Sequence, residues 1–142
     1  MDWNYLLNGF HGRIGRQTFW MAMSVVYVAN VLACLAADQI QGDRLSAIVD
    51  LAFTYPEFAV AVKRAHDRDL PVWLLIIFFA ANGILDLFSV LGWPITVEEP
   101  GWPLLAVLVP FGVLGVALLI ELGFRRGTVG PNQYGPDPLA KS

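Results

Sequence analysis

Residues 63–69 read KRAHDRD and interrupt a chain that is otherwise strongly apolar. Apolar stretches flank them at about residues 45–62 and 72–92, and two more lie at about residues 18–38 and 103–122. A helix needs about 20 apolar residues to cross the roughly 30 Å of bilayer hydrocarbon. The sequence therefore predicts a membrane protein with four spans.

The composition excludes a soluble globular domain. Hydrophobic residues make up 56% of the 142 residues, charged residues make up 15%, and the mean hydropathy is +0.57. Soluble domains carry about 25% charged residues, and a core of this size could not hide the apolar excess from water. The net charge of -3 excludes binding of nucleic acid through bulk charge. The single cysteine, Cys34, excludes a disulfide framework.

The positions of the basic residues favour four spans over three. The second span contains Asp50 and Glu57, each of which costs about 2.5–3.5 kcal/mol near the bilayer centre. With four spans, however, every Lys and Arg except Arg44 lies on one face of the membrane. With three spans, residues 63–69 and residues 125–126 would be exported, against the positive-inside rule. We therefore expect a multi-pass protein with both termini in the cytoplasm.

Two segments outside the spans complete the single domain predicted over residues 1–142. Residues 2–10 place Trp3, Leu6, Leu7 and Phe10 on one helix face, which predicts a short helix lying in the membrane interface. Residues 123–142 contain GTVGPNQYGPDP, whose Gly, Pro, Asn and Asp favour turns. The predicted fold is all-α, a four-helix transmembrane bundle with an interfacial helix and a turn-rich cytoplasmic tail.

Polar side chains recur inside the predicted spans. On the second span they follow at steps of three or four residues, so they share a helix face that should look inward. Intramembrane carboxylates often line a path for protons or cations, but a lone four-helix bundle has little lumen, so this function would need an oligomer. Alternatively, these groups only join helices through hydrogen bonds. The residues concerned are Asn30, Asp50, Glu57, Asn82 and Asp86.

Ionisable side chains also gather at the predicted inner boundary. Such groups either mark topology while their stems snorkel, or bind an anionic lipid headgroup. We expect Asp67 to accept hydrogen bonds from Arg13, Arg16 or His66, and the tail to complete a polar cap. Glu121 and Arg125 are spaced i, i+4, which predicts a local ion pair. The candidate cap residues are Arg13, Arg16, Arg64, His66, Asp67, Arg125, Asn132 and Tyr134.

Catalytic and cofactor motifs are absent from the sequence. There is no P-loop, HExxH, CxxC or nucleophile elbow. The only histidines are His11 and His66, too few for an ordinary catalytic metal site. We therefore expect no metal, no cofactor and no enzymatic activity. An enzyme acting on lipid would have only His66 as its general base.

Three motifs resemble those of the DUF805 family. They are GRIGRQTFW at residues 12–20, KRAHDRD at residues 63–69 followed by Trp73, and FRRGTVGPNQYGPDPL at residues 124–139. The resemblance covers essentially the whole chain. It implies a four-helix, multi-pass protein of the bacterial cytoplasmic (inner) membrane with no established biochemical activity.

These observations lead to one preferred hypothesis and one alternative. The preferred hypothesis is a non-enzymatic binding or scaffold protein in the lipid bilayer, whose cytoplasmic cap takes an anionic phospholipid headgroup or another membrane protein. The alternative is an oligomeric proton or cation transporter, or a channel subunit, that uses the intramembrane carboxylates. A homo-oligomer is compatible with both, and no nucleic acid partner is expected.

Overall fold

The chain is helical in the computed structural model, which describes residues 2–92 and 102–140. The helices are α1 (Trp3–Leu7), α2 (Arg16–Gln41), α3 (Asp43–Asp67), α4 (Trp73–Val90) and α5 (Trp102–Leu119), and α5 continues into a π-helix, η1 (Ile120–Phe124). No strand forms among the described residues. The prediction of an all-α fold is confirmed.

Three helices are long and apolar enough to cross a membrane, namely Arg16–Ile40, Asp43–Asp67 and Trp73–Val90. A further apolar helical stretch, Leu108–Phe124, is shorter. The second predicted span is thus one continuous helix in spite of its two carboxylates. It also runs past residue 62 to Asp67, so KRAHD, the first five residues of KRAHDRD, is helical.

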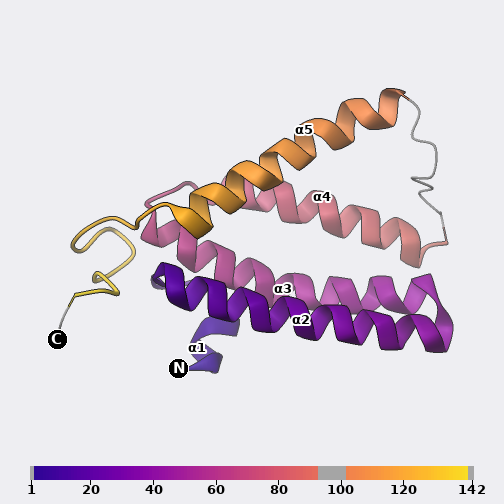
Figure 1. Ribbon diagram of the computed structural model, residues 1–142, viewed down its shortest axis with the longest axis horizontal. Coiled ribbons are helices and arrows are strands. Elements are labelled where there is room, and N and C mark those ends of the chain that lie inside the picture. The colour runs from indigo at the N-terminus through magenta and orange to yellow at the C-terminus, as the bar shows by residue number, and fades with distance from the viewer. Residues whose placement is uncertain (1, 93–101, 141–142) are drawn as a thin grey trace.

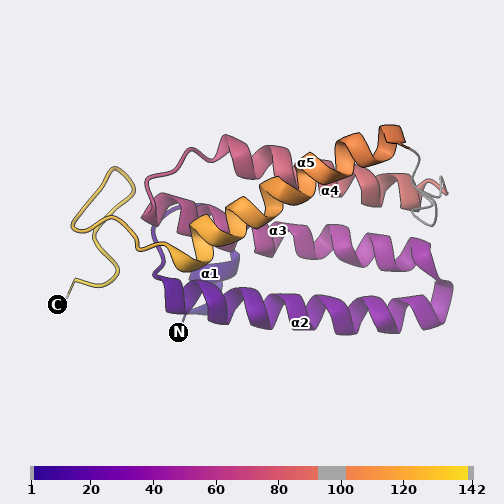
Figure 2. The same cartoon turned by 45° about the horizontal axis from the view of Figure 1, so that its top comes forward.

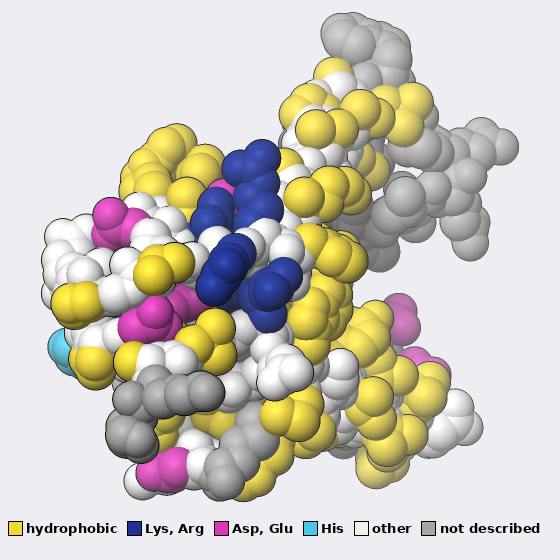
Figure 3. Space-filling model, turned by 60° about the vertical axis from the view of Figure 1, so that its left-hand side comes forward, with side chains coloured by type: hydrophobic (Ala, Val, Ile, Leu, Met, Phe, Trp, Pro, Cys, Tyr) yellow, Lys and Arg dark blue, Asp and Glu magenta, His cyan; other side chains and the backbone are white. Residues whose placement is uncertain are grey.

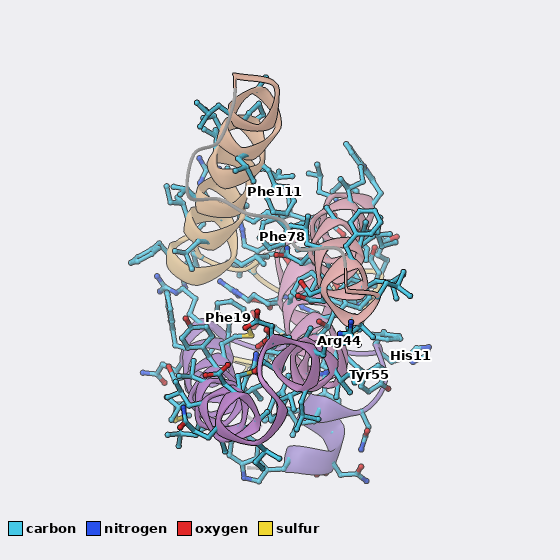
Figure 4. The ribbon with its side chains drawn as sticks, turned by 90° about the vertical axis from the view of Figure 1, so that its right-hand side faces the viewer. His11, Phe19, Arg44, Tyr55, Phe78 and Phe111 are labelled. Carbon is cyan, nitrogen blue, oxygen red and sulfur yellow. The ribbon has the colours of Figure 1, made fainter. Side chains whose placement is uncertain are left out.

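The helices run antiparallel along one long axis, and both termini lie at the same end (Figure 1). α2 and α3 lie side by side, α4 packs on α3, and α5 returns towards the termini (Figures 1 and 2). α5 meets α4 through the stacked rings of Phe78 and Phe111, 4.8 Å apart (Figure 4). Elsewhere α5 diverges, and Val109 and Val113 are 59% and 64% exposed. A closed bundle of four spanning helices therefore stays a prediction.

The packed core lies towards the end that carries the termini. It is formed by Leu6, Ile14, Phe19, Ala22, Val60, Ala61, Val62, Ala65, Leu75, Leu118 and Leu122. Towards the other end of α2, large apolar side chains such as Leu32, Leu35 and Ile40 are at least 60% exposed. This distribution suits helices that face lipid over most of their length and protein at one end.

The short N-terminal helix belongs to the same packed end. α1 covers Trp3–Leu7, within the predicted residues 2–10, and the Asp2 side chain caps it by accepting from the Tyr5 N–H at 3.1 Å. Leu6 is 2% exposed, but Trp3, which the sequence pattern places on the same apolar face, is 40% exposed, so only part of that face is covered by protein. It packs on α3. Its place in a membrane interface stays a prediction.

Candidate functional site

The candidate site lies where α2 begins and where α3 and η1 end. Three segments meet there, residues 12–16, 63–69 and 121–135, and we call this assembly the basic cap. Lys and Arg side chains form a continuous patch on this end of the molecule, with Asp and Glu side chains beside it (Figure 3). The predicted convergence of the three motifs is therefore present in the fold.

Asp67, at the end of α3, accepts hydrogen bonds from two arginines. Its Oδ1 accepts from Arg13 Nε at 3.2 Å and from Arg13 Nη2 at 3.0 Å, and its Oδ2 accepts from Arg64 Nη1. Asp67, Arg13 and Arg64 are only 3%, 6% and 0% exposed. One carboxylate cannot satisfy two buried guanidinium groups, so their other N–H groups need further acceptors.

Backbone carbonyls at the end of the last helix supply many of these acceptors. The last four carbonyls of a helix have no partner within it, and a helix C-terminus carries a partial negative charge that arginine stabilises. Five consecutive carbonyl oxygens each accept from a side chain. The bonds are Arg64 Nε to Leu122 at 2.7 Å, Trp20 Nε1 to Gly123 at 3.0 Å, Arg16 Nη1 to Phe124 at 3.1 Å, Arg64 Nη2 to Arg125 at 2.6 Å, and Arg68 Nη1 to Arg126.

The tail after η1 folds back over the end of α3. The Thr128 N–H and hydroxyl donate to Asp67 O at 2.8 and 3.1 Å. Arg13 reaches the same segment, because its Nη1 donates to Gly130 O at 2.8 Å and to Gly135 O at 3.2 Å. Arg13 therefore ties the start of α2 to the tail as well as to α3.

His66 forms the second contact between α3 and the tail. Its imidazole stacks on the Tyr134 ring with 3.8 Å between centroids, and its backbone oxygen accepts from Asn132 Nδ2 at 2.8 Å. With its proton on Nδ1, the ring donates to Gly12 O at 3.2 Å. His66 thus packs between the tail and the segment before α2, and it does not bond to Asp67.

Gly127 allows the tail to approach Asp67 closely. A Cβ built at Gly127 would lie 2.0 Å from Asp67 Oδ2, closer than any side chain could sit. Only glycine therefore permits this contact. Gly127 and Thr128 of the tail motif thus have structural roles. Gly127 lets the tail approach Asp67, and Thr128 supplies the hydrogen bonds to it.

Lys63 closes the side of the cap that faces α1. Its Nζ donates to Leu6 O at 3.1 Å, to Asn8 O at 3.4 Å and to Gly9 O at 2.5 Å. Lys63 is 1% exposed. It stabilises the end of α1 as arginines stabilise the end of η1, which explains a buried lysine in this position.

A smaller ion-pair cluster borders the cap. Glu121 accepts from Arg68 Nη2 at 2.5 Å and pairs with Arg125 Nε at 3.1 Å. The predicted i, i+4 pair of Glu121 and Arg125 is confirmed. The Arg125 side chain is 63% exposed, so this pair is worth little by itself.

The basic residues of the cap differ in exposure. Arg13, Lys63 and Arg64 are buried and Arg68 is half-buried, whereas Arg16, Arg125 and Arg126 are exposed. A surface groove of about 700 Å³ opens beside the exposed group and is lined by Arg16, Gln17, Trp20, Met21, Gly123 and Phe124. Positive charge that can meet a ligand lies at this groove and beside it.

Some of the polar residues inside the spans contact one another. Asn30 Nδ2 of α2 donates to Asp50 Oδ1 of α3 at 2.8 Å, and Cys34 Sγ donates to Asn30 Oδ1 at 3.1 Å. The Ser46 hydroxyl donates to Cys34 O at 3.2 Å. These bonds join α2 to α3.

The other three polar residues of the spans, Glu57, Asp86 and Asn82, each have different surroundings. Glu57 Oε1 is buried and has no hydrogen-bond partner among the described residues, although the Glu57 carboxyl group also interacts with the Asn30 side chain. Asp86 of α4 lies close enough to Asp50 to interact with it electrostatically. Asn82 Nδ2 donates to Phe78 O of its own helix at 2.9 Å. Within residues 2–92 and 102–140, no three His, Cys, Asp or Glu side chains gather as metal ligands.

The candidate cap residues predicted from the sequence do not include Lys63, Arg68, Thr128 and Glu121, although each of them forms hydrogen bonds in the cap. Lys63 and Arg68 belong to KRAHDRD, as Arg64 does. Their side chains point in other directions from the helix, which a linear motif does not reveal. Thr128 carried a usable signal, because a hydroxyl inside a turn-rich segment often bonds to backbone. Glu121 was expected to pair with Arg125, but its second partner, Arg68, comes from a different helix.

Comparison with known proteins places the chain in a family. A family model described as a protein of unknown function (DUF805) matches residues 7–136. The chain is 33% identical over 135 residues to the uncharacterized protein YiiR of Escherichia coli strain K12, covering 92% of this chain and 86% of that protein. It is 27% identical over 150 residues to the inner membrane protein YhaH of the same strain, covering 97% of each. No solved structure matches the chain. The family resemblance of the three motifs is confirmed, and the chain belongs to the DUF805 family of membrane proteins.

Proposed function

We propose that this chain is a non-enzymatic protein of the bacterial inner membrane whose basic cap binds the headgroup of an anionic phospholipid. In this proposal the chain has four spans and both termini are cytoplasmic. The location draws on the relative named as an inner membrane protein. The orientation draws on the positive-inside rule, because the cap segments and the tail carry every Lys and Arg of the sequence except Arg44.

The observation that carries the proposal is the division between buried and exposed basic residues. Arg13 and Arg64 are predicted headgroup ligands, but they donate to Asp67 and to backbone carbonyls, so we assign them the role of holding the cap together. Arg16, Arg125 and Arg126 are exposed on its surface. Each basic residue near an anionic leaflet contributes about 1 kcal/mol, so three of them favour anionic over zwitterionic lipid.

Lipid selectivity tests this proposal. The protein is reconstituted in phosphatidylcholine vesicles, and the motionally restricted fraction of spin-labelled phosphatidylglycerol is measured by electron paramagnetic resonance. Joint Arg125→Gln and Arg126→Gln removes about 2 kcal/mol, which is about a thirtyfold loss of selectivity. Arg44→Gln, at the opposite end of the molecule, is the matched control.

Two outcomes contradict the proposal. One is a wild-type protein that restricts phosphatidylglycerol and phosphatidylcholine equally, as expected if the cap binds a partner membrane protein instead. The other is a double variant that keeps the wild-type selectivity.

A second candidate function rests on Glu57. A buried carboxylate oxygen without a hydrogen-bond partner is costly inside a membrane, and such groups usually belong to a path for protons or cations. Asp50 and Asp86 lie near one another on α3 and α4. The Asn30–Asp50 bond favours the other interpretation, in which these groups join helices.

Flux measurements separate the two interpretations. In proteoliposomes, conduction predicts that proton or cation flux is lost in Glu57→Gln and in Asp50→Asn with Asp86→Asn. Asp38→Asn, an exposed residue near the end of α2, serves as the control. Unaltered flux in both variants would exclude the transport function. Hydrogen bonding between helices would then be the role of these residues.

A further inference from the structure

The groove beside Arg16 continues along α2 as an apolar groove. The first groove is lined by Arg16, Gln17, Trp20, Met21, Gly123 and Phe124. The second, of about 400 Å³, is lined by Phe19, Trp20, Met23, Ser24, Tyr27 and Leu119. Trp20 belongs to both linings, so the two grooves adjoin. Together they form one seam between α2 and the end of the α5–η1 helix.

The seam is open because the hydrogen bonds between α2 and the last helix that flank it lie near the cap, where Arg16 donates to Phe124 O at 3.1 Å. The Trp20 ring lies against Gly123, where a Cβ would be 2.6 Å from the ring, and Trp20 Nε1 donates to Gly123 O at 3.0 Å. Beyond this contact α5 diverges from α2 (Figures 1 and 2). Val113 and Val116 are accordingly 64% and 58% exposed. The two walls of the seam are thus fixed at the cap and apart elsewhere.

The seam is charged at one end and apolar along its length. A guanidinium group has five N–H donors, and Arg16 uses one of them on Phe124 O, so others can meet a phosphate. From Arg16 to Tyr27, α2 rises about 17 Å at 1.5 Å per residue. This is about half of the roughly 30 Å hydrocarbon thickness, the depth of one leaflet.

We infer that this seam is a binding site for one whole anionic phospholipid, with the phosphate at Arg16 and one acyl chain lying along Trp20 and Ser24 against Leu119. The inference rests on the proposed headgroup function and names the ligand of that same site. A free phosphate would meet the charge at Arg16 but would leave the apolar part empty. Charge at the mouth and a leaflet-long apolar wall together match a lipid.

Filling the apolar part from either wall tests the inference. Ser24→Phe narrows the seam from α2, and Leu119→Phe narrows it from α5. Val25→Phe and Val116→Phe are the matched controls, because both residues are more than 50% exposed and line neither groove. Selectivity for spin-labelled phosphatidylglycerol over phosphatidylcholine is measured in vesicles of phosphatidylcholine.

Both seam variants should lose at least about threefold in selectivity, while the two controls keep the wild-type value. The effect is moderate because lipid tails gain only packing contacts when they move from bilayer to protein. Glycerol phosphate, added as the headgroup without acyl chains, should not displace the spin-labelled lipid.

The inference is overturned if both seam variants keep the wild-type selectivity, or if glycerol phosphate displaces the lipid. In either case a selective wild-type protein leaves the headgroup function standing. If the wild-type protein shows no preference for phosphatidylglycerol, the headgroup function fails, and the seam site fails with it.

Discussion

Asp67 is buried between Arg13 and Arg64, and each segment of the basic cap contributes to this trio or bonds to it. Two cations around one anion leave positive charge in the interior, and the carbonyls of Leu122 and Arg125 and those of the tail compensate for it. The pairing of Arg13 with Asp67 could be predicted from the motifs. The bond from Arg64 to Asp67 has the i, i+3 spacing of one helix turn, so it too had a signal in the sequence.

Removing the charge of Asp67 should destabilise the protein strongly. Asp67→Asn leaves two buried guanidinium groups without an anion, which costs about 3–5 kcal/mol in the free energy of unfolding. Denaturant unfolding in detergent measures this. Asp69→Asn is the matched control, because Asp69 is exposed and its side chain accepts a hydrogen bond from the exposed Gln133, from Nε2 at 3.0 Å. Equal stability of Asp67→Asn and Asp69→Asn would show that the trio is not the centre of the cap.

Among the elements, the end of the last helix was the least predictable. The apolar run over residues 103–122 predicts a helix, but nothing in it encodes the π-helix that ends at Phe124. The acceptors that Arg64, Arg16 and Trp20 use are backbone carbonyls. Every residue has a carbonyl, so a site built from them leaves no pattern in the side chains. The donors could therefore be predicted as a group, but their partners could not.

The contact between Trp20 and Gly123 gives a prediction for this element. A methyl group at Gly123 would lie 2.6 Å from the Trp20 ring, so Gly123→Ala should displace the ring and break its hydrogen bond to the helix end. We expect a loss of about 1–3 kcal/mol, as for other overpacked sites, and a shift in tryptophan emission. In the control, Gly83→Ala, the new Cβ lies 3.6 Å from Leu51, so the free energy of unfolding should be unchanged or higher. Unchanged emission in Gly123→Ala would contradict the contact.

The folded conformation of the tail should depend on pH, because the ionised Asp137 side chain stabilises it. Its carboxylate accepts from the Leu139 N–H at 2.8 Å and from the Gly130 N–H at 3.0 Å, and these bonds lower the pKa of Asp137. A lowered pKa in the folded state gives stability that is present above the ordinary value of about 3.9 and is lost as the pH falls through the lowered value. The Gly130 and Leu139 amide chemical shifts should titrate below about pH 4. In Asp137→Asn they should not titrate, and a titration that persists there would assign the effect to another group.

At the scale of the molecule, the number of helices and the convergence of their basic ends followed from hydropathy and charge. The divergence of α5 from the other helices did not follow from hydropathy and charge. A lipid tail is about as apolar as leucine, so the same apolar sequence suits a helix face against lipid and one against another helix. The pattern of residues 103–122 therefore predicts a helix in the membrane without saying which side of it is covered.

Membrane topology can be tested on the whole chain. In a Cys34→Ser background, single cysteines in place of Asp69 and Val129 should react with a membrane-impermeant reagent only after the bacterial inner membrane is opened. A cysteine in place of Asp43, the first residue of α3, should react from outside. Labelling of Asp69→Cys and Val129→Cys from opposite sides would separate the cap segments and contradict the four-span orientation.

The cap joins residues 12–16 to residues 121–135, and this sets an order for biogenesis. A nascent chain that has inserted α2 and α3 already carries Arg13, Arg64 and Asp67, but carbonyls that accept from these arginines come later in the chain, between residues 122 and 135. The trio is closed only once residue 135 has emerged. Completion of the cap therefore follows the synthesis of residue 135, and a product truncated before residue 121 leaves Arg13, Arg64 and Asp67 at the membrane surface without these carbonyls.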